Sequence, residues 1–359
     1  MRHEIDQRIY PALPARHIRV LRLHPGAAED PLRATLCDIS LDSVLNFEAL
    51  SYTWGSPTYE DDLFLGEQRY PLVITKSLNE PLVALRLRNR DRDIWVDQVC
   101  INQGDTEEKS TQIQLMAEIY ANANRVISWL GTPTPDTPSG MAILAYLVGT
   151  DSTGEWGGAD APWNSLDTTD LVRSVNDILS RPYFSRVWVV QEASLARRVM
   201  LQVGSECLEW SRGISTRRFL ARIKMAELVH LRQESNVAIV DFRPLRDLLE
   251  QSLAYDARRN GSHEIPSLLD IAHSFRDRNC LDPRDKIYGV MGLVTAAQVA
   301  GFVPNYASAW EETYEQFYQL VERQIVADSD RILRGSEKER PREVTSVVQC
   351  PSCSRILQV

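Results

Sequence analysis

The chain has 359 residues, of which 43% are hydrophobic and 25% are charged. That composition allows a substantial core in one large domain or in two. With 40 Lys and Arg against 49 Asp and Glu, the formal net charge is −9. This balance argues against a general nucleic-acid or anionic-membrane binder, because affinity for phosphate comes mainly from clustered positive charge.

The cysteines and the apolar runs exclude several further classes. Six cysteines are scattered along the chain, which is too sparse for a disulfide scaffold and favours reduced thiols. The charged amino-terminal segment shows no secretory signal, and no apolar run approaches the roughly 18–20 residues that span a bilayer. Cys350 and Cys353 form an isolated pair without the further ligands of a closed zinc site. We therefore expect a cytoplasmic protein with no membrane span and no metal site.

Strands dominate the start of the chain, after an N-terminal arm over residues 1–17. Residues 18–40 alternate about a Pro-Gly break and predict a β-hairpin, and 62–74 predict a second hairpin. Between them, 48–52 predict a strand that ends in a turn-rich segment. A helix is expected to start at Ser77 and to end near residue 88. Together these elements predict a β-rich N-terminal frame.

Between residues 94 and 131 the pattern changes to strand, helix and strand. Residues 94–97 predict a short buried strand, and 125–130 predict the returning strand. Asp105 and Glu108 resemble a capping box at the start of the helix that connects them. A crossover helix of this length between two strands indicates a parallel βαβ unit.

The next segments alternate between breakers and helical patterns. Residues 132–163 hold four prolines and five glycines, so we interpret them as an inserted surface excursion with one short helix. A second helix is predicted over 171–179, followed by a longer helix over 181–196 and a strand at 199–203.

The remainder of the chain divides into a helical region and a tail. From residue 205 to about 325 the patterns are mainly helical, and we assign residues 211–327 to a helical region. Residues 328–359 are charged and aperiodic and cannot bury enough surface to offset an ordering entropy of about 1–2 kcal/mol per residue. We expect this segment to be a disordered tail.

Three sequence blocks carry a resemblance to a known family. They are FEALSYTWG at 47–55, IWVDQVCINQ at 94–103 and RPYFSRVWVVQE at 181–192. In order and spacing they resemble the fungal heterokaryon incompatibility (HET) domain, with the likeness extending over residues 18–210. The segment DPRDKIYG at 282–289 is similar to one that follows the domain in many fungal members. Gln98 and Val99 depart modestly from the second block.

A more distant resemblance links the HET domain to Toll/interleukin-1 receptor (TIR) domains. Leu50-Ser51-Tyr52 resembles the first TIR box, and residues 185–192 resemble the TIR helix in which a Trp precedes a Glu. The likeness implies an α/β fold with a TIR- or flavodoxin-like parallel sheet and a helical C-terminal region. In TIR enzymes that Glu serves in NAD cleavage. The resemblance thus makes Glu192 the candidate catalytic residue of an NAD(P) glycohydrolase, with NAD as substrate and no cofactor.

Four further residues are candidates for binding the NAD. Tyr52 and Trp54 leave a strand at the edge where open α/β sheets bind ligands, and Asp97 ends the neighbouring strand at the same edge. Trp188 precedes Glu192 by one helical turn, so both could face one cleft. These positions predict that Tyr52 and Trp54 converge with Asp97 and Glu192 on one depression at the carboxyl ends of the strands.

Each candidate also has a structural interpretation. Glu192 could pair with Arg197 or another base on a helix surface. Trp54 could cap the core beside Gly55, and Asp97 could bond the loop at 100–103. Sequence alone leaves these alternatives open.

The family implies self/non-self recognition and programmed cell death. One hypothesis is an effector that cleaves NAD(P), and the alternative is a non-catalytic signalling or self-association module. Partners would be other incompatibility proteins or a second copy of the chain. The two hypotheses separate at Glu192, which should face a cleft with aromatic neighbours if it is catalytic. Otherwise it should face solvent or be fully salt-bridged.

Overall fold

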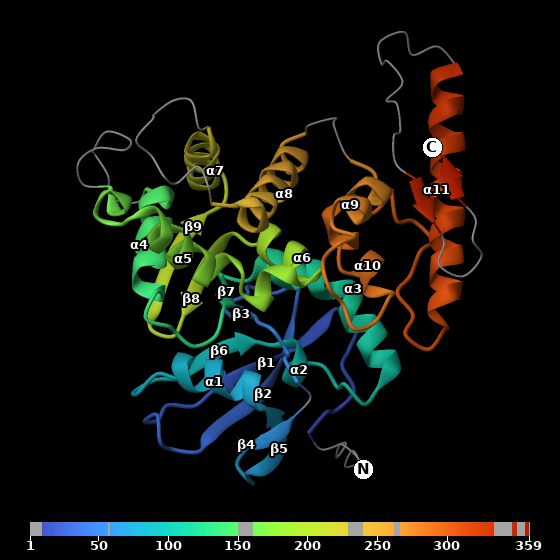
Figure 1. Cartoon of the computed structure of the whole chain (residues 1–359). Coiled ribbons are helices and arrows are strands. Elements are labelled where there is room, and N and C mark those ends of the chain that lie inside the picture. Colours follow the sequence, from blue (N-terminus) through green and yellow to red (C-terminus); the bar gives the residue numbers. More distant parts are fainter. Residues whose placement is uncertain are drawn as a thin grey trace.

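The computed structural model describes residues 9–56, 58–149, 161–228, 240–261, 266–333, 347–349 and 356–358. Side chains are described up to residue 327. Strands and helices combine into a mixed α/β fold (Figure 1). Among the described helices, none is both long and apolar enough to cross a membrane.

A nine-stranded mixed sheet runs through the molecule in the order β5-β4-β2-β1-β6-β3-β7-β8-β9. Its strands are β1 (His17–Leu23), β2 (Leu32–Ser40), β3 (Glu48–Ser51), β4 (Tyr59–Leu65), β5 (Tyr70–Thr75), β6 (Arg92–Trp95), β7 (Val126–Trp129), β8 (Arg198–Val203) and β9 (Glu206–Ser211). Both predicted hairpins are confirmed, because β1 pairs with β2 and β4 pairs with β5, each antiparallel. These strands continue the central sheet, so the expected N-terminal frame is not a separate unit.

The centre of the sheet is parallel. β3 lies between β6 and β7 and is parallel to both, and β7 is parallel to β8. The predicted βαβ unit is therefore confirmed in direction, although β3 is inserted between its two strands. When β3, β6, β7 and β8 are numbered 1 to 4 along the chain, their order across the sheet is 2-1-3-4. The first four strands of flavodoxin-like sheets have the same order. Antiparallel β1 and β9 flank them, so the sheet as a whole departs from the purely parallel one that was expected.

The helices cover the sheet and extend it towards the carboxyl terminus. They are α1 (Lys76–Leu85), α2 (Asp97–Cys100), α3 (Thr106–Asn122), α4 (Thr137–Val148), α5 (Thr168–Leu179), α6 (Val189–Ser194), α7 (Ile214–Glu227), α8 (Arg243–Arg259), α9 (Leu268–Ser274), α10 (Asp285–Tyr288) and α11 (Trp310–Leu333), with 3-10 turns η1 (Pro162–Ser165), η2 (Pro182–Ser185) and η5 (Met291–Leu293). α6 packs on β3 and β7 and contacts α3 and α8, while α4 packs on α5, α7 and β9. α11 stands at one side and joins the body through Phe317, whose ring lies 6.2 Å from that of Phe302 (Figure 1).

Two expectations for the middle of the chain differ from the structure. The segment 181–196 is broken into η2 and α6, because Arg186 forms a strand-like bridge with Asn279 and the Val187 amide donates to the Asn279 carbonyl at 2.9 Å. The segment 132–163 is not only a surface excursion. Its helix α4 belongs to the core, where Leu144 and Leu147 are fully buried.

Three boundaries also differ from expectation. α1 begins at Lys76 without a side-chain cap, and the Ser77 hydroxyl instead donates to the Trp54 carbonyl. β9 occupies a segment that was expected to be helical. α11 reaches Leu333, so the proposed start of the tail at 328 falls inside a helix. Beyond it, β10 (Val347–Gln349) and β11 (Ile356–Gln358) pair with each other, and the rest of the predicted tail lies outside the described residues.

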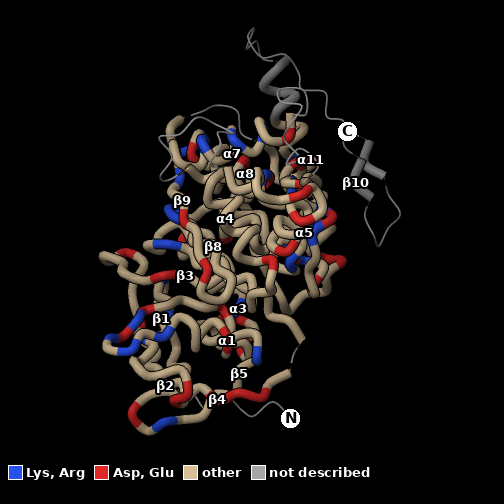
Figure 2. Tube along the Cα trace, turned by 60° about the vertical axis from the view of Figure 1, so that its left-hand side comes forward, with Lys and Arg blue, Asp and Glu red and all other residues tan. Residues whose placement is uncertain are grey.

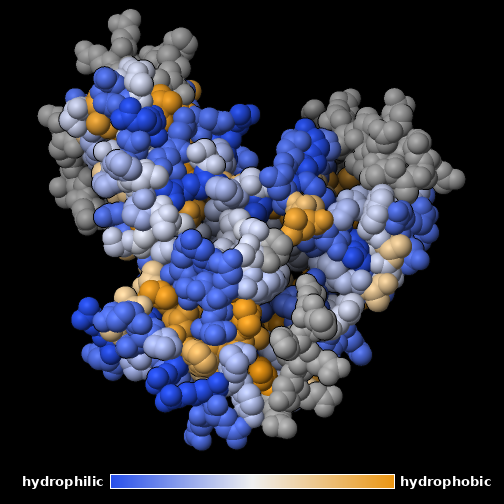
Figure 3. All heavy atoms as spheres, turned by 60° about the horizontal axis from the view of Figure 1, so that its bottom comes forward, coloured by the Kyte–Doolittle hydropathy of each residue, from blue (hydrophilic) through white to orange (hydrophobic). Residues whose placement is uncertain are grey.

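Apolar burial joins the sheet and the helices into one body. The buried hydrophobic residues form one continuous cluster that extends from Ile18 in β1 to Val321 in α11. Trp129 is buried, whereas Trp188 is half-buried. On the face seen in Figure 3, hydrophobic residues form small patches among hydrophilic ones. Charges of both signs are interspersed along the chain (Figure 2).

Candidate functional site

A polar cluster occupies the carboxyl ends of the two central parallel strands. Ser51 ends β3, and Ser128 stands opposite it in β7. The Tyr183 hydroxyl, from η2, lies 3.0 Å from Ser51 Oγ and donates to Ser128 Oγ at 2.7 Å. Glu192, from α6, accepts a hydrogen bond from Ser51 through Oε2. Three segments distant in sequence therefore meet through one chain of hydroxyl groups.

Glu192 is the buried carboxyl of this cluster, whereas Asp97 is half-buried. Only 1% of Glu192 is exposed. Burial raises its pKa from the ordinary value of 4.5 to about 7, against the opposing effects of the Arg186 charge and the Ser51 hydrogen bond. Near neutral pH, both protonation states of Glu192 are therefore populated.

The hydroxyl chain accommodates both states of this carboxyl. Ser51 carries one hydroxyl proton, so it cannot donate to Glu192 and to Tyr183 at the same time. With Glu192 protonated, Glu192 can donate to Ser51, Ser51 to Tyr183 and Tyr183 to Ser128. With Glu192 ionised, the Ser51 proton turns to the carboxylate. Rotation of one hydroxyl thus switches the network between the two states.

Arg186 is the cation nearest to Glu192. Its Nη1 lies 3.9 Å from Glu192 Oε2 and donates to the Tyr52 carbonyl. The charges of Glu192 and Asp97 both raise the pKa of Arg186 and offset the effect of its burial. The guanidinium therefore stands between two carboxyl groups. Its side chain is 18% exposed, against 2% for that of Glu192, so Arg186 forms the outer layer of the cluster.

Trp54 and Asp97 are bonded to each other beside Arg186. The indole Nε1 of Trp54 donates to Asp97 at 3.0 and 3.2 Å, and the Gln98 amide donates to Asp97 Oδ1 at 2.7 Å. Burial raises the pKa of Asp97, and the Arg186 charge opposes that rise. Gln103 Nε2 donates to the Asp97 carbonyl at 2.8 Å, which ties the following loop to this position. Asp97 thus combines the loop-bonding role with a place in the cluster.

Tyr52 and Trp188 lie differently from what the motifs suggested. Tyr52 is buried next to the cluster, and its hydroxyl has no hydrogen-bond partner among the described residues. The Trp188 side chain instead lies close enough to the Asp285 carboxyl in α10 to lower its pKa, against the larger effect of burial. Arg197 does not pair with Glu192, because it donates to the Ala121 carbonyl and to Asn122. The structure therefore brings Tyr52, Trp54, Asp97 and Glu192 together around Arg186 and directs Trp188 elsewhere.

Ser128 and Tyr183 were missed at the sequence level. Tyr183 lies inside the third sequence block, but nothing in that block indicated that its hydroxyl would reach β3 and β7. Ser128 occupies a buried strand position where an apolar residue would be ordinary. Within its own strand the Ser128 hydroxyl has no partner, and this need for a partner was the only signal in the sequence.

The sequence profile described as "Heterokaryon incompatibility protein (HET)" matches residues 47–192, from the start of the first sequence block to Glu192. The chain carries a HET domain. A curated relative, "Heterokaryon incompatibility protein 6, OR allele" of Neurospora crassa, is 26% identical over 367 aligned positions. The alignment covers 89% of this chain and 53% of that protein, so the chain spans about half the length of its relative. No solved structure matches.

The polar cluster is thus a feature of the HET domain of this chain. Its residues Ser51, Asp97, Tyr183 and Glu192 all fall within the matched range.

Proposed function

We propose that this chain acts in the cytoplasm as an effector of heterokaryon incompatibility that hydrolyses NAD(P) at Glu192 and so promotes cell death after non-self recognition. The HET domain supports the incompatibility role. The enzymatic part rests on one observation, a buried carboxyl with a pKa of about 7 at the carboxyl end of β3. Between β3 and β7 the chain order of the parallel strands reverses, which is where open α/β sheets bind ligands.

Hydrolysis would proceed at the ribose carbon that carries nicotinamide. The bond between C1′ and the nicotinamide nitrogen breaks, and its electron pair leaves with neutral nicotinamide. C1′ gains oxocarbenium character, which an ionised Glu192 stabilises by its charge or through the ribose hydroxyls. Water then adds to C1′ and loses one proton, giving ADP-ribose, nicotinamide and a proton. The Glu192 carboxylate is the base that can accept that proton.

In this proposal, the residues around Glu192 hold the carboxylate and leave one side open to the substrate. Ser51 and Arg186 both contact Oε2, while in the part of the chain that the structure describes Oε1 accepts no hydrogen bond. The substrate would approach from the side of Arg186, because that side chain is the more exposed of the two. Trp54, half-buried and held by Asp97, offers an aromatic face at the rim. The strand order 2-1-3-4 supports the distant likeness to TIR domains.

A non-catalytic module is the second candidate, and the burial of Glu192 favours it. In this second candidate, the Glu192 side chain, 2% exposed and bonded to Ser51, fastens α6 to β3 and takes no part in chemistry. The domain would then act by docking other incompatibility proteins or a second copy of the chain.

Nicotinamide release from NAD and NADP by the purified full chain distinguishes the two candidates. Glu192→Gln preserves size and the bond to Ser51 but removes the carboxylate, so it should abolish release without lowering the melting temperature. Glu107→Gln, an exposed position at the start of α3, is the matched control and should release nicotinamide at the wild-type rate. Folded wild-type protein that releases none, or equal release by Glu192→Gln, would overturn the enzymatic proposal and favour the non-catalytic module.

A further inference from the structure

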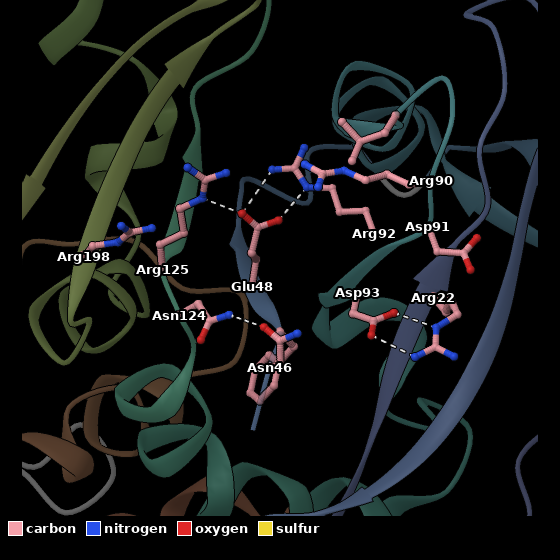
Figure 4. Close-up of a pocket in the computed structure, with 12 residues that line it drawn as sticks. Arg22, Asn46, Glu48, Arg90, Asp91, Arg92, Asp93, Asn124, Arg125 and Arg198 are labelled. Atoms are coloured by element: carbon pink, nitrogen blue, oxygen red, sulfur yellow. Dashed lines mark hydrogen bonds and ion pairs between the residues drawn. The ribbon is translucent and has the colours of Figure 1, made fainter. Parts of the chain in front are cut away.

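A cleft of about 570 Å³ opens at the edge of the sheet opposite the Glu192 cluster. It is lined by the first residues of parallel strands, namely Glu48 in β3, Arg92 in β6 and Arg198 in β8, together with Arg125 just before β7 (Figure 4). Glu48 and Ser51 are the first and last residues of β3. The cleft and the Glu192 cluster therefore lie at opposite ends of one strand and are separate sites.

Guanidinium groups outnumber carboxylates on one wall of this cleft. Glu48 binds Arg92 at 2.5 Å and also contacts Arg125. Glu209, behind the wall, is shared between Arg125 at 3.2 Å and Arg198 at 3.4 Å. Three cations thus share two carboxylates, which leaves one positive charge unbalanced.

Arg90 adds a second unbalanced charge to the same wall. It is exposed, lines the cleft and has no carboxylate within 4.0 Å among the described residues. In Figure 4 the Arg90 side chain extends towards Arg92 and Glu48, whereas the Asp91 carboxylate points away from them. Asp91 lies 3.0 Å from His24, and Asp93 is neutralised by two hydrogen bonds from Arg22.

These unbalanced charges stand out in a chain whose formal net charge is −9. Arg92 and Arg125 are also partly desolvated, with side chains 12% and 27% exposed. Partial burial strengthens the attraction of cations for an anion, because water screens it less. The wall is therefore arranged to hold an anion of about two negative charges.

We propose that this cleft binds a phosphate-bearing small molecule of nucleotide size. A phosphate monoester carries about −1.5 to −2 charges at pH 7 on three acceptor oxygens, which matches the excess of the wall. Guanidinium forks bind such oxygens in pairs. The volume lies within the roughly 300–1,000 Å³ of small-molecule sites. Asn46 and Asn124, bonded to each other at 2.7 Å, supply amide groups for the remainder of the ligand.

Titration calorimetry on the full chain at low salt tests the proposal with ADP, ribose 5-phosphate and inorganic phosphate as probes, and with succinate as a dianion that lacks phosphate. We expect saturable binding of the phosphates and at least about tenfold weaker binding of succinate. Raising the salt concentration should weaken the binding. A clear preference for ADP over ribose 5-phosphate would identify nucleotides as the ligands, and equal affinity would identify the phosphate group alone.

Paired substitutions locate the binding. Arg90→Ala should weaken ADP binding by about tenfold or more. Arg88→Ala removes the same charge from an exposed position of the same loop outside the cleft. This control should weaken ADP binding by less than about twofold. Glu192→Gln should leave ADP binding unchanged. The test of this site is therefore independent of the test of NAD cleavage. Absence of saturable binding, equal effects of Arg90→Ala and Arg88→Ala, or loss of binding in Glu192→Gln would each overturn the proposal.

Discussion

Ser51 and Glu192, which are 141 positions apart in the chain, are joined by a hydrogen bond from Ser51 Oγ to Glu192 Oε2 in the interior. The bond fastens the six-residue helix α6 to the end of β3. Because Ser51 is a neutral donor and Arg186 is 3.9 Å away, the charge of Glu192 is only partly compensated. This incomplete compensation lets burial raise the pKa of Glu192 to about 7, and it makes the residue sensitive to pH.

The first prediction concerns the pH dependence of stability. Between about pH 4.5 and 7 the folded chain keeps a proton on Glu192 that the unfolded chain releases, so the free energy of unfolding falls as pH rises. The full effect across this window is roughly 3 kcal/mol. Glu192→Gln mimics the neutral acid. Between pH 4.5 and 8 its free energy of unfolding should rise relative to that of wild type by up to that amount.

Urea denaturation at several pH values measures this difference. Subtracting the two curves removes the contribution of all other titrating groups, which wild type and Glu192→Gln share. Parallel curves from pH 4.5 to 8 would show that the pKa of Glu192 is not raised.

The second prediction tests the hydroxyl chain. Ser51→Ala leaves Glu192 without its neutral donor in a buried position, which should lower the free energy of unfolding by about 1–3 kcal/mol at pH 8. The pKa of Glu192 should rise further, because the Ser51 hydrogen bond lowers it. Ser43→Ala removes an exposed hydroxyl and should change stability by less than about 0.5 kcal/mol. Similar losses in both variants would mean that the bond to Glu192 contributes little.

The third prediction concerns the contact between α4 and α5. A Cβ atom on Gly140 would lie 2.1 Å from the Ser174 carbonyl oxygen, and a backbone atom cannot rotate away. Gly140→Ala should therefore lower the free energy of unfolding by about 1–3 kcal/mol or more. In a helix without this contact, replacing Gly by Ala would raise the free energy of unfolding by about 1 kcal/mol. Ser139→Ala, one position earlier, serves as control, and a stabilised Gly140→Ala would show that the two helices do not pack this closely.

Local patterns were sufficient for the hairpins and for the direction of β6 and β7, because alternation and turn residues lie close together in sequence. The insertion of β3 between β6 and β7 was not predictable from these patterns, since it depends on pairing between distant segments. The break in the segment 181–196 has the same origin. Its bridge to Asn279 overrides a local helical preference.

The site was predictable to the extent that short motifs marked strand ends. Tyr52 and Asp97 follow strands that proved to be neighbours, and Arg186 connects their surroundings to Glu192. The role of Tyr183 was not predictable, because its hydroxyl contacts depend on the register that sets Ser51 opposite Ser128. The proximity of Trp188 to Asp285 likewise depends on how α10 packs on the domain.

The last prediction links Arg186 to the pH profile of the proposed reaction. Hydrolysis needs the ionised form of Glu192, so nicotinamide release should rise up to tenfold per pH unit below about pH 7 and level off above it. The Arg186 charge lowers the pKa of Glu192, so Arg186→Met should move the midpoint of the profile to higher pH. Rates at pH 6, 7, 8 and 9, with Arg173→Met as an exposed control of equal charge change, measure that shift. A midpoint that stays near 7 in Arg186→Met, with the melting temperature unchanged, would mean that a group other than Glu192 controls the profile.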